Sequence, residues 1–149
     1  MTKPTINFEL EGMDEIVAMM NKLGDLPKKF ATVSAKEGAR IALVAAKLNA
    51  PRDEGNLIKG IVLKGEKKPY PSKKMYQVTM NSKMNDIFVK MSNGNRYYYP
   101  ASIEFGFIGR DGVKVPGVHF MEKALTSNNT QIETAILRRL LSELEKVTR

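Results

Sequence analysis

The longest helical pattern in the chain covers residues 27–50, and a proline stands at each end of it. Pro27 suits the first turn of a helix because its missing N–H would be unpaired there, and Pro51 cannot continue the helix. At about 100° per residue, large apolar side chains gather on one side, and small ones, mostly alanine, extend round the back. The large residues on that side are Phe30, Val33, Ile41, Val44 and Leu48. We expect a helix with this pattern to be packed on most of its sides.

A narrow basic strip is the only polar opening of this helix. Its members fall within about 40° of arc, and they are Lys29, Lys36, Arg40 and Lys47. Four cations in line suit the phosphates of DNA, to which contacts are independent of sequence. The alternative is a solvated face, because a packed helix must place its polar residues somewhere.

Amphipathic segments flank the long helix on both sides. Residues 5–10 alternate between polar and apolar and predict a short strand. Residues 13–23 have apolar positions at helical spacing and end before Gly24, so we expect the two helices to form a bent pair. Near the other end of the chain, Thr130 and Glu133 make a capping-box pattern for a helix that runs to about residue 148.

The middle of the chain shows the alternation that is typical of strands. Residues 57–63 are β-prone around Gly60, which indicates a bulge or a close backbone approach. Residues 75–80 and 85–91 alternate on either side of a polar turn and predict two further strands.

A last strand candidate covers residues 96–107, although Pro100 indicates an edge position or a break there. Residues 107–118 are rich in glycine and are predicted to be looped. Residues 119–125 then begin a short helical turn.

These elements predict one α+β domain over residues 1–149. We expect a small, mostly antiparallel sheet of about four or five strands, packed against the long central helix and the C-terminal helix. The lysine-rich stretch 64–74 contains two prolines and no core residue, so it is predicted to be a mobile basic loop. Its candidates for contact with DNA are Lys67, Lys68, Lys73 and Lys74.

The charge of the chain favours polyanions or acidic protein surfaces as partners. Its net charge is +8 and its isoelectric point is about 9.7. In a chain of 149 residues this charge creates a field that attracts negative partners. A merely soluble basic protein would have the same balance.

Missing residue types exclude several kinds of site. There is no cysteine, which excludes disulfides, thiolate metal sites and cysteine nucleophiles, and the single histidine, His119, cannot form a two-histidine zinc site. No apolar run approaches the roughly 18 residues of a membrane span, and the early acidic residues do not fit a signal peptide. We therefore expect a protein made in the cytosol, with no cofactor and no membrane contact.

The candidate catalytic groups do not form an enzyme signature. The paired carboxylates fall in a first helical turn, a loop and a helical tail, which are solvent-facing contexts. Glu104 differs because it stands in a strand-like stretch, where it is either solvated or meets a partner. The tyrosines at 97–99 are suited to three alternative roles, which are stacking on nucleic-acid bases, pairing across strands and forming a protein interface.

Four short stretches occur in a distinctive order. The first covers residues 10–16, and the second joins Ala50-Pro51 to Gly55-Asn56-Leu57. The third is YPASIEFG at residues 99–106, and the fourth is HFMEKAL at residues 119–125. Together they resemble the tail-completion and head–tail joining proteins, or neck proteins, of long-tailed bacteriophages and prophages. The chain departs from the usual family residues at Phe107, His119 and Lys123.

The resemblance implies a non-enzymatic virion component that assembles in the host cytoplasm. It implies a ring, a hexamer in this family, at the interface between tail tube and head connector. The implied partners are further copies of the chain, a head-completion or connector protein, a tail-tube or tail-terminator protein, and packaged DNA. The candidates for subunit contact are Tyr97, Tyr98, Tyr99, Glu104, Phe105 and Phe107.

Two other function classes stay open. In a free nucleic-acid-binding domain, the same positive charge would contact phosphates directly and without sequence preference. A small enzyme has the least support, because no nucleophile motif is present.

Overall fold

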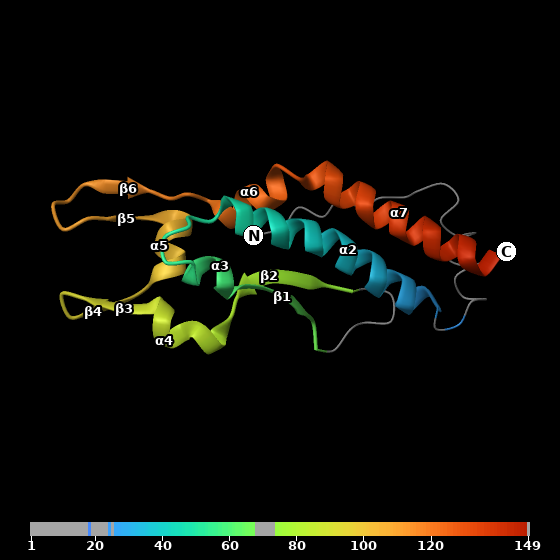
Figure 1. The fold of residues 1–149 in the computed structure, drawn as a ribbon, viewed down its shortest axis with the longest axis horizontal. Helices are drawn as coiled ribbons and strands as arrows, with labels where there is room; N and C mark the ends of the chain where they lie inside the picture. The colour runs from blue at the N-terminus through green and yellow to red at the C-terminus, as the bar shows by residue number, and fades with distance from the viewer. Residues whose placement is uncertain (1–17, 19–23, 25, 68–73, 149) are drawn as a thin grey trace, which may run out of the picture.

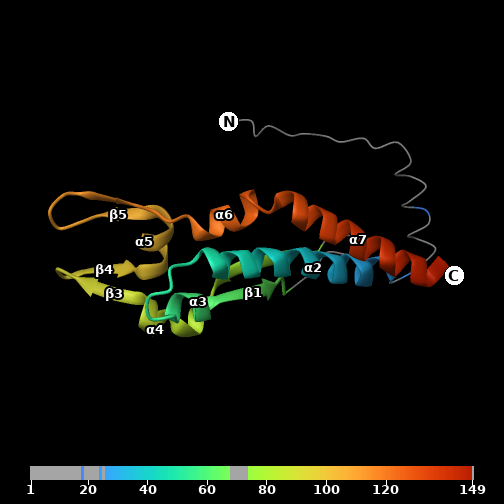
Figure 2. The same cartoon turned by 45° about the horizontal axis from the view of Figure 1, so that its top comes forward.

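Two long antiparallel helices form the body of the molecule. In the computed structural model, which describes residues 18, 24, 26–67 and 74–148, α2 (Leu26–Asn49) lies beside α7 (Asn129–Thr148) (Figures 1 and 2). The start of α2 lies near the end of α7. Gly38 permits this close approach, because a Cβ placed there would lie 2.6 Å from Cγ1 of Ile136. The predicted bounds of the long helix are confirmed to within one residue.

The buried side of α2 is its small-residue side. Ser34, Gly38, Ala42 and Ala46 are buried there, and Phe30 is the one residue of the large apolar group that is also buried. Of the large apolar residues predicted to face the core, Val44 is 57% exposed and Leu48 is 65% exposed. That part of the prediction is wrong because close packing against neighbouring backbone selects small side chains, whatever the hydrophobicity of the larger ones.

The main core lies where the end of α2 meets three short elements. These are α3 (Asn56–Gly60), β1 (Ile61–Gly65) and α6 (Phe120–Thr126). The buried residues that pack together there are Ala46, Ala50, Leu57, Ile61, Phe120 and Ala124.

The described strands form three separate antiparallel hairpins, and the single sheet of four or five strands predicted from the sequence is wrong in this respect. The first hairpin pairs β1 with β2 (Tyr76–Met80) and packs on α2. The second pairs β3 (Val89–Ser92) with β4 (Asn95–Tyr98), and the third pairs β5 (Gly106–Ile108) with β6 (Lys114–Pro116). Short helices between the hairpins separate them. The class remains α+β.

Three of those short helices replace segments that the sequence predicts as strands. They are α3, α4 (Asn85–Phe88) and α5 (Tyr99–Phe105). The 3₁₀ turn η1 (Ser82–Met84) falls in the polar turn that the sequence predicts between two strands. Pro100 explains α5, since it occupies the first turn of that helix and needs no N–H partner there. The prediction that residues 107–118 form a loop is also wrong in part, because this stretch contains most of the β5–β6 hairpin.

The basic loop is shorter than residues 64–74. Lys64 and Gly65 belong to β1, and the backbone pairing continues to Glu66, whose N–H donates to the carbonyl of Met75 at 3.2 Å. Residues 68–73 lie outside the described part of the chain, as do the predicted N-terminal strand and most of the predicted N-terminal helix. The C-terminal helix is confirmed, although it begins before Thr130, which therefore lies inside it.

Candidate assembly surface

Two hairpins project as parallel arms from one end of the molecule. The β3–β4 and β5–β6 hairpins extend beyond the helical body at the end remote from the terminus of α7 (Figures 1 and 2). Asn93 and Gly94 have φ angles of 53° and 77°, which suit the tight two-residue turn of β3–β4. Large apolar side chains remain exposed on the arms, with 67% for Met91 and 74% for Ile108.

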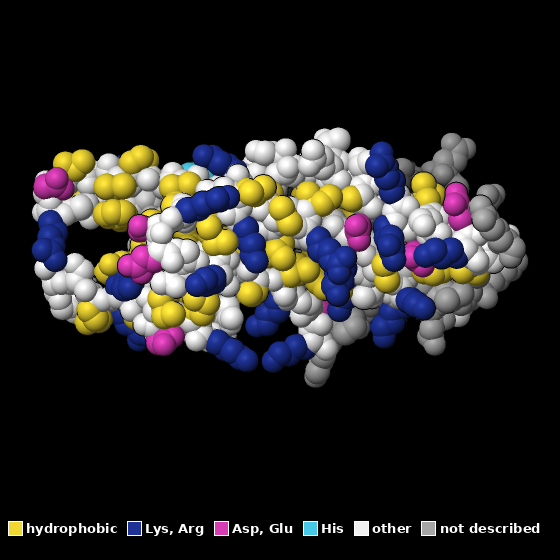
Figure 3. Space-filling model, viewed as in Figure 1, with side chains coloured by type: hydrophobic (Ala, Val, Ile, Leu, Met, Phe, Trp, Pro, Cys, Tyr) yellow, Lys and Arg dark blue, Asp and Glu magenta, His cyan; other side chains and the backbone are white. Residues whose placement is uncertain are grey.

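A mainly apolar groove of about 580 Å³ separates the two arms. Tyr97 and Phe107 line it from opposite hairpins, and Tyr99 and Ile103 line it from α5. Figure 3 shows the open space between the arms. The structure therefore brings together three of the residues predicted for subunit contact, from segments that are adjacent in sequence but belong to different elements.

The remaining contact candidates lie apart from this groove. Phe105 is 74% exposed at the end of α5. Tyr98 is half-buried and packs edge to face against Phe88, with ring centroids 6.1 Å apart. Burial raises the pKa of Tyr98 above its usual value. Phe105 is thus available to a partner, whereas Tyr98 belongs to the base of its own hairpin.

Glu104 is a buried helix cap, so its assignment to a solvated or partner-facing strand position is wrong. One carboxylate oxygen accepts the backbone N–H of Met121 at 3.0 Å, and the other accepts that of Glu122 at 3.1 Å. Unpaired N–H groups at the start of a helix are good partners for a carboxylate. Glu104 therefore joins α5 to the start of α6. Only the fold reveals this role, because the two ends of the contact are 17 and 18 residues apart.

The backbone reinforces the same junction. The N–H of Val118 donates to the carbonyl of Ile103 at 2.8 Å, and that of His119 donates to the carbonyl of Glu104 at 3.1 Å. Gly117 is required there, because a Cβ would meet the carbonyl oxygen of Glu104. The base of the β5–β6 arm is consequently held by α5.

His119 and Glu122 lie beside Glu104, and the three could offer ligand atoms within 4.8 Å of one another. However, both oxygens of Glu104 already accept N–H groups. Nδ1 of His119 lies 3.0 Å from an oxygen of Glu122, and both of these side chains are substantially exposed. The geometry is that of a helix start that is stabilised by its neighbours.

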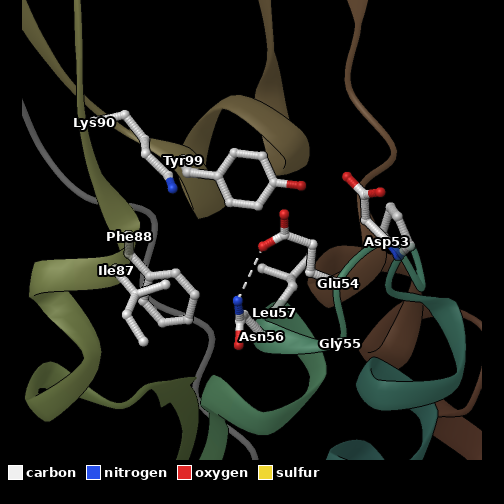
Figure 4. Close-up of a pocket in the computed structure, with 10 residues that line it drawn as sticks. Asp53, Glu54, Gly55, Asn56, Leu57, Ile87, Phe88, Lys90 and Tyr99 are labelled. Carbon is white, nitrogen blue, oxygen red and sulfur yellow. Dashed lines mark hydrogen bonds between the residues drawn. The ribbon is translucent and has the colours of Figure 1, made fainter.

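A small pocket of about 140 Å³ joins the base of the other arm to the end of α2. Figure 4 shows the hydroxyl of Tyr99 and the carboxylate of Glu54 pointing into the same space, with Asp53 beside them and Lys90 across the ring. Desolvation by burial raises the pKa of Tyr99, and the negative charges of Asp53 and Glu54 raise it further. Gly55, with a φ of 78°, lines the same pocket.

The second, third and fourth distinctive stretches of the sequence thus meet at these two junctions, and the first lies outside the described residues. Tyr99 from the third stretch contacts the pocket formed by the second, and Glu104 from the third stretch caps the fourth. Because these stretches hold the arms onto the body, their residues position the assembly surface.

The basic strip of α2 lies largely in solvent. Lys29, Lys36 and Arg40 are exposed, and Lys47 is half-buried. Nη1 of Arg40 is 3.9 Å from a carboxylate oxygen of Glu37. In Figure 3, basic side chains are interspersed with hydrophobic ones over the middle of the molecule.

The lysines of the β1–β2 hairpin were also predicted to contact DNA. Lys67 is exposed, and Nζ of Lys74 lies 5.2 Å from the centroid of the Tyr76 ring. Lys68 and Lys73 lie outside the described residues.

Sequence reasoning missed an exposed apolar strip that borders the basic strip. It consists of the exposed Val44 and Leu48 and the half-buried Ile41 on α2, and it lines a groove of about 350 Å³ beside Asn128 and Gln131. The helical periodicity did group these residues, but exposure depends on where α7 lies, which periodicity cannot show.

Comparison with known families identifies the chain. A family model described as "Bacteriophage HK97-gp10, putative tail-component" matches residues 14–106, which is more than half of the chain. The chain belongs to the HK97-gp10-like family. This agrees with the resemblance to phage tail-completion and head–tail joining proteins. Comparisons with curated proteins and with solved structures found no match.

The HK97-gp10-like match covers the elements from α2 to α5, so it includes the β3–β4 arm, Tyr99 and Glu104. Membership makes the protein a phage tail component, a structural protein of the virion. Within the described ranges, no helix has the length and apolar character needed to cross a membrane.

Proposed function

We propose that this tail component forms a ring at the head–tail interface, where it completes the tail and joins it to the head connector around the DNA channel. The ring is a hexamer assembled in the host cytoplasm. Its neighbours are a head-completion or connector protein on one side and a tail-tube or tail-terminator protein on the other. The protein acts by binding and has no catalytic activity.

The observation that carries this proposal is the pair of projecting arms. A two-stranded hairpin is at best marginally stable in water without a further layer packed on it. Here two such hairpins expose Met91, Ile108 and Val113, the last by 58%. Exposed apolar residues that gather at one end of a molecule mark a surface for another protein. A subunit whose arms are covered by neighbours in a ring satisfies this requirement.

Replacing exposed aromatic residues tests the proposal. Phe105→Asp and Phe107→Asp are expected to leave a folded subunit, because these side chains are 74% and 48% exposed, but to prevent its entry into rings and particles. Circular dichroism measures the fold, and native mass and particle incorporation measure assembly. Leu137→Asp on α7, at a residue that is 58% exposed, is the matched control. Normal incorporation of both phenylalanine variants would contradict the proposal.

The exposed lysines favour a second activity, which is contact with packaged DNA that is independent of sequence. Lys29, Lys36 and Lys67 are free of acidic partners within 4.0 Å among the described residues. In a neck ring these side chains would attract the phosphates of the genome as it passes. A free nucleic-acid-binding domain is the alternative function that the same charge supports.

A further inference from the structure

The apolar strip of α2 is a surface that no described element of the chain covers. Val44 is 57% exposed and Leu48 is 65% exposed, and with Ile41 they line the groove of about 350 Å³ between α2 and the start of α7. A groove beside two helices, lined by apolar residues at helical spacing, is suited to the apolar face of a third helix.

The charged residues beside the groove indicate which kind of helix would bind there. Helical geometry places Arg40 about 40° from Val44 around the axis of α2, and Lys36 and Lys47 lie just beyond Arg40. The apolar strip is therefore bordered along one edge by the basic strip, with Glu37 as the acidic residue on the rim of the groove. Such a surface is complementary to an apolar ridge accompanied by acidic residues.

The chain itself contains a segment with that chemistry. Residues 9–25 include five acidic residues and one lysine, in a protein whose net charge is +8. Within them, Met13, Ile16, Val17 and Met20 are spaced at i, i+3, i+4 and i+7, which is the spacing of a helix that docks in a groove. This segment lies outside the described residues, apart from Ala18 and Gly24.

We infer that residues 13–23 of one copy dock in the α2 groove of the neighbouring copy. This inference rests on the proposed ring, for which it supplies one specific contact. The contact joins two different surfaces, so it is head-to-tail, and contacts of that kind generate rings when the rotation closes.

Reach argues against the copy's own segment as the occupant. Gly24, with a φ of 63°, lies two residues before the start of α2. If residues 13–23 formed a helix that folded back from this turn, it would be about 16 Å long and would extend to about residue 37 of α2. The apolar strip begins at Ile41, about 22 Å along α2, and ends about 33 Å along it. A neighbour's segment has no such restriction.

Disulfide cross-linking tests this contact cleanly, because the chain has no cysteine of its own. One tagged copy would have Val44→Cys, and the other copy would have Ile16→Cys, Val17→Cys or Met20→Cys. The matched control is Glu15→Cys, which lies on the opposite side of the predicted helix. After the copies are mixed, assembled and mildly oxidised, we expect a cross-link between two chains when the cysteine is at residue 16, 17 or 20. We expect no such cross-link for the Glu15→Cys control.

The outcomes separate this inference from the ring proposal. Rings of normal mass without a preferential cross-link would overturn the inference and leave the ring intact. The absence of any ring would overturn both. An intrachain cross-link in a dilute Ile16→Cys/Val44→Cys double variant would show that a copy's own segment fills its groove. If added duplex DNA shields Val44→Cys from a thiol reagent and the neighbouring segment does not, the strip is a nucleic-acid site instead.

Discussion

Glu104 shows how one residue acquires its role from the contact it makes. It stands near the end of α5, and its carboxylate accepts the first free N–H groups of α6. Neighbouring residues give no sign of this role, because the alternating stretch around Glu104 is as suitable for a strand. A buried carboxylate is stable there because the helix start satisfies both of its oxygens.

Removing that carboxylate should loosen the base of the β5–β6 arm. Glu104→Ala is expected to lower the free energy of unfolding by about 1–3 kcal/mol, because it leaves the part-buried N–H groups of Met121 and Glu122 unpaired. Glu104→Gln should lower it less, since its amide oxygen still accepts one of them. Chemical denaturation measures both, with the exposed Glu145→Ala as control. Equal stability of all three variants and the parent would show that the cap contributes nothing.

Glu143 is the second carboxylate whose partners determine its state. A hydrogen bond from Lys146 at 3.0 Å lowers its pKa from the usual 4.5, and the charges of Lys146, Arg139 and Lys29 lower it further, against the opposing effect of burial. The stabilisation is therefore present above the usual pKa and is lost as the pH falls through the lowered one.

The lowered pKa of Glu143 predicts how the stability of a Glu143→Gln variant depends on pH. Glu143→Gln should reduce stability at neutral pH, and the difference from the parent should shrink as the pH falls below about 4.5. Thermal unfolding measured from pH 7 to pH 3 tests this. A difference that is constant over that range would mean that the ionised carboxylate is not the stabilising form.

At the scale of elements, the contact between α2 and α7 depends on side-chain size. Gly38 allows Ile132 and Ile136 to pack directly on the backbone of α2. Val44 and Leu48 are exposed on another face of α2, away from the face on which α7, α6 and β1 pack. The same helix therefore has a packed face and an open face.

A larger side chain at Gly38 should push α2 and α7 apart. Gly38→Leu is expected to lower the free energy of unfolding by about 1–3 kcal/mol through overpacking against Ile136. Adding Ile136→Ala should restore part of that loss, since it makes room for the new side chain, and a double-mutant cycle measures this coupling. Strict additivity of the two changes would contradict the direct contact.

At the scale of the whole molecule, the exposed apolar surface of the arms and the exposed lysines lie in different regions. The arms expose apolar surface at one end, while exposed lysines lie along α2 and at the β1–β2 hairpin. This division fits a ring subunit that meets other proteins with one region and packaged DNA with another.

The proposed contact between the exposed lysines and DNA can be tested with variants that leave the apolar strip unchanged. Replacing Lys29, Lys36 and Lys67 by glutamine should leave ring assembly intact, with a small loss of stability where the charge of Lys29 acts on Glu143. It should reduce retention of DNA in filled particles, with the difference largest at low salt. Arg40 and Lys47 are kept because they border the groove. The control replaces Lys59, Lys83 and Lys123, which are also exposed but lie elsewhere. Retention equal to that of the parent would show that the first three lysines are solvated only.

The sequence by itself determined where the two long helices lie. Prolines bounded α2, and helical periodicity identified α7. These signals are local, because the missing N–H of proline and the permissive backbone of glycine act on their own residues. Family membership was equally accessible, since the distinctive stretches are short and contiguous.

The tertiary structure alone decided which faces are covered and which strands pair. The residues of α5 have strand-like character, yet Pro100 and the contact of Glu104 with α6 favour a helix. Val44 and Leu48 have the character of core residues, yet no described element packs over them. Burial and pairing depend on elements that are distant in the chain, and a periodic pattern contains no information about where those elements lie.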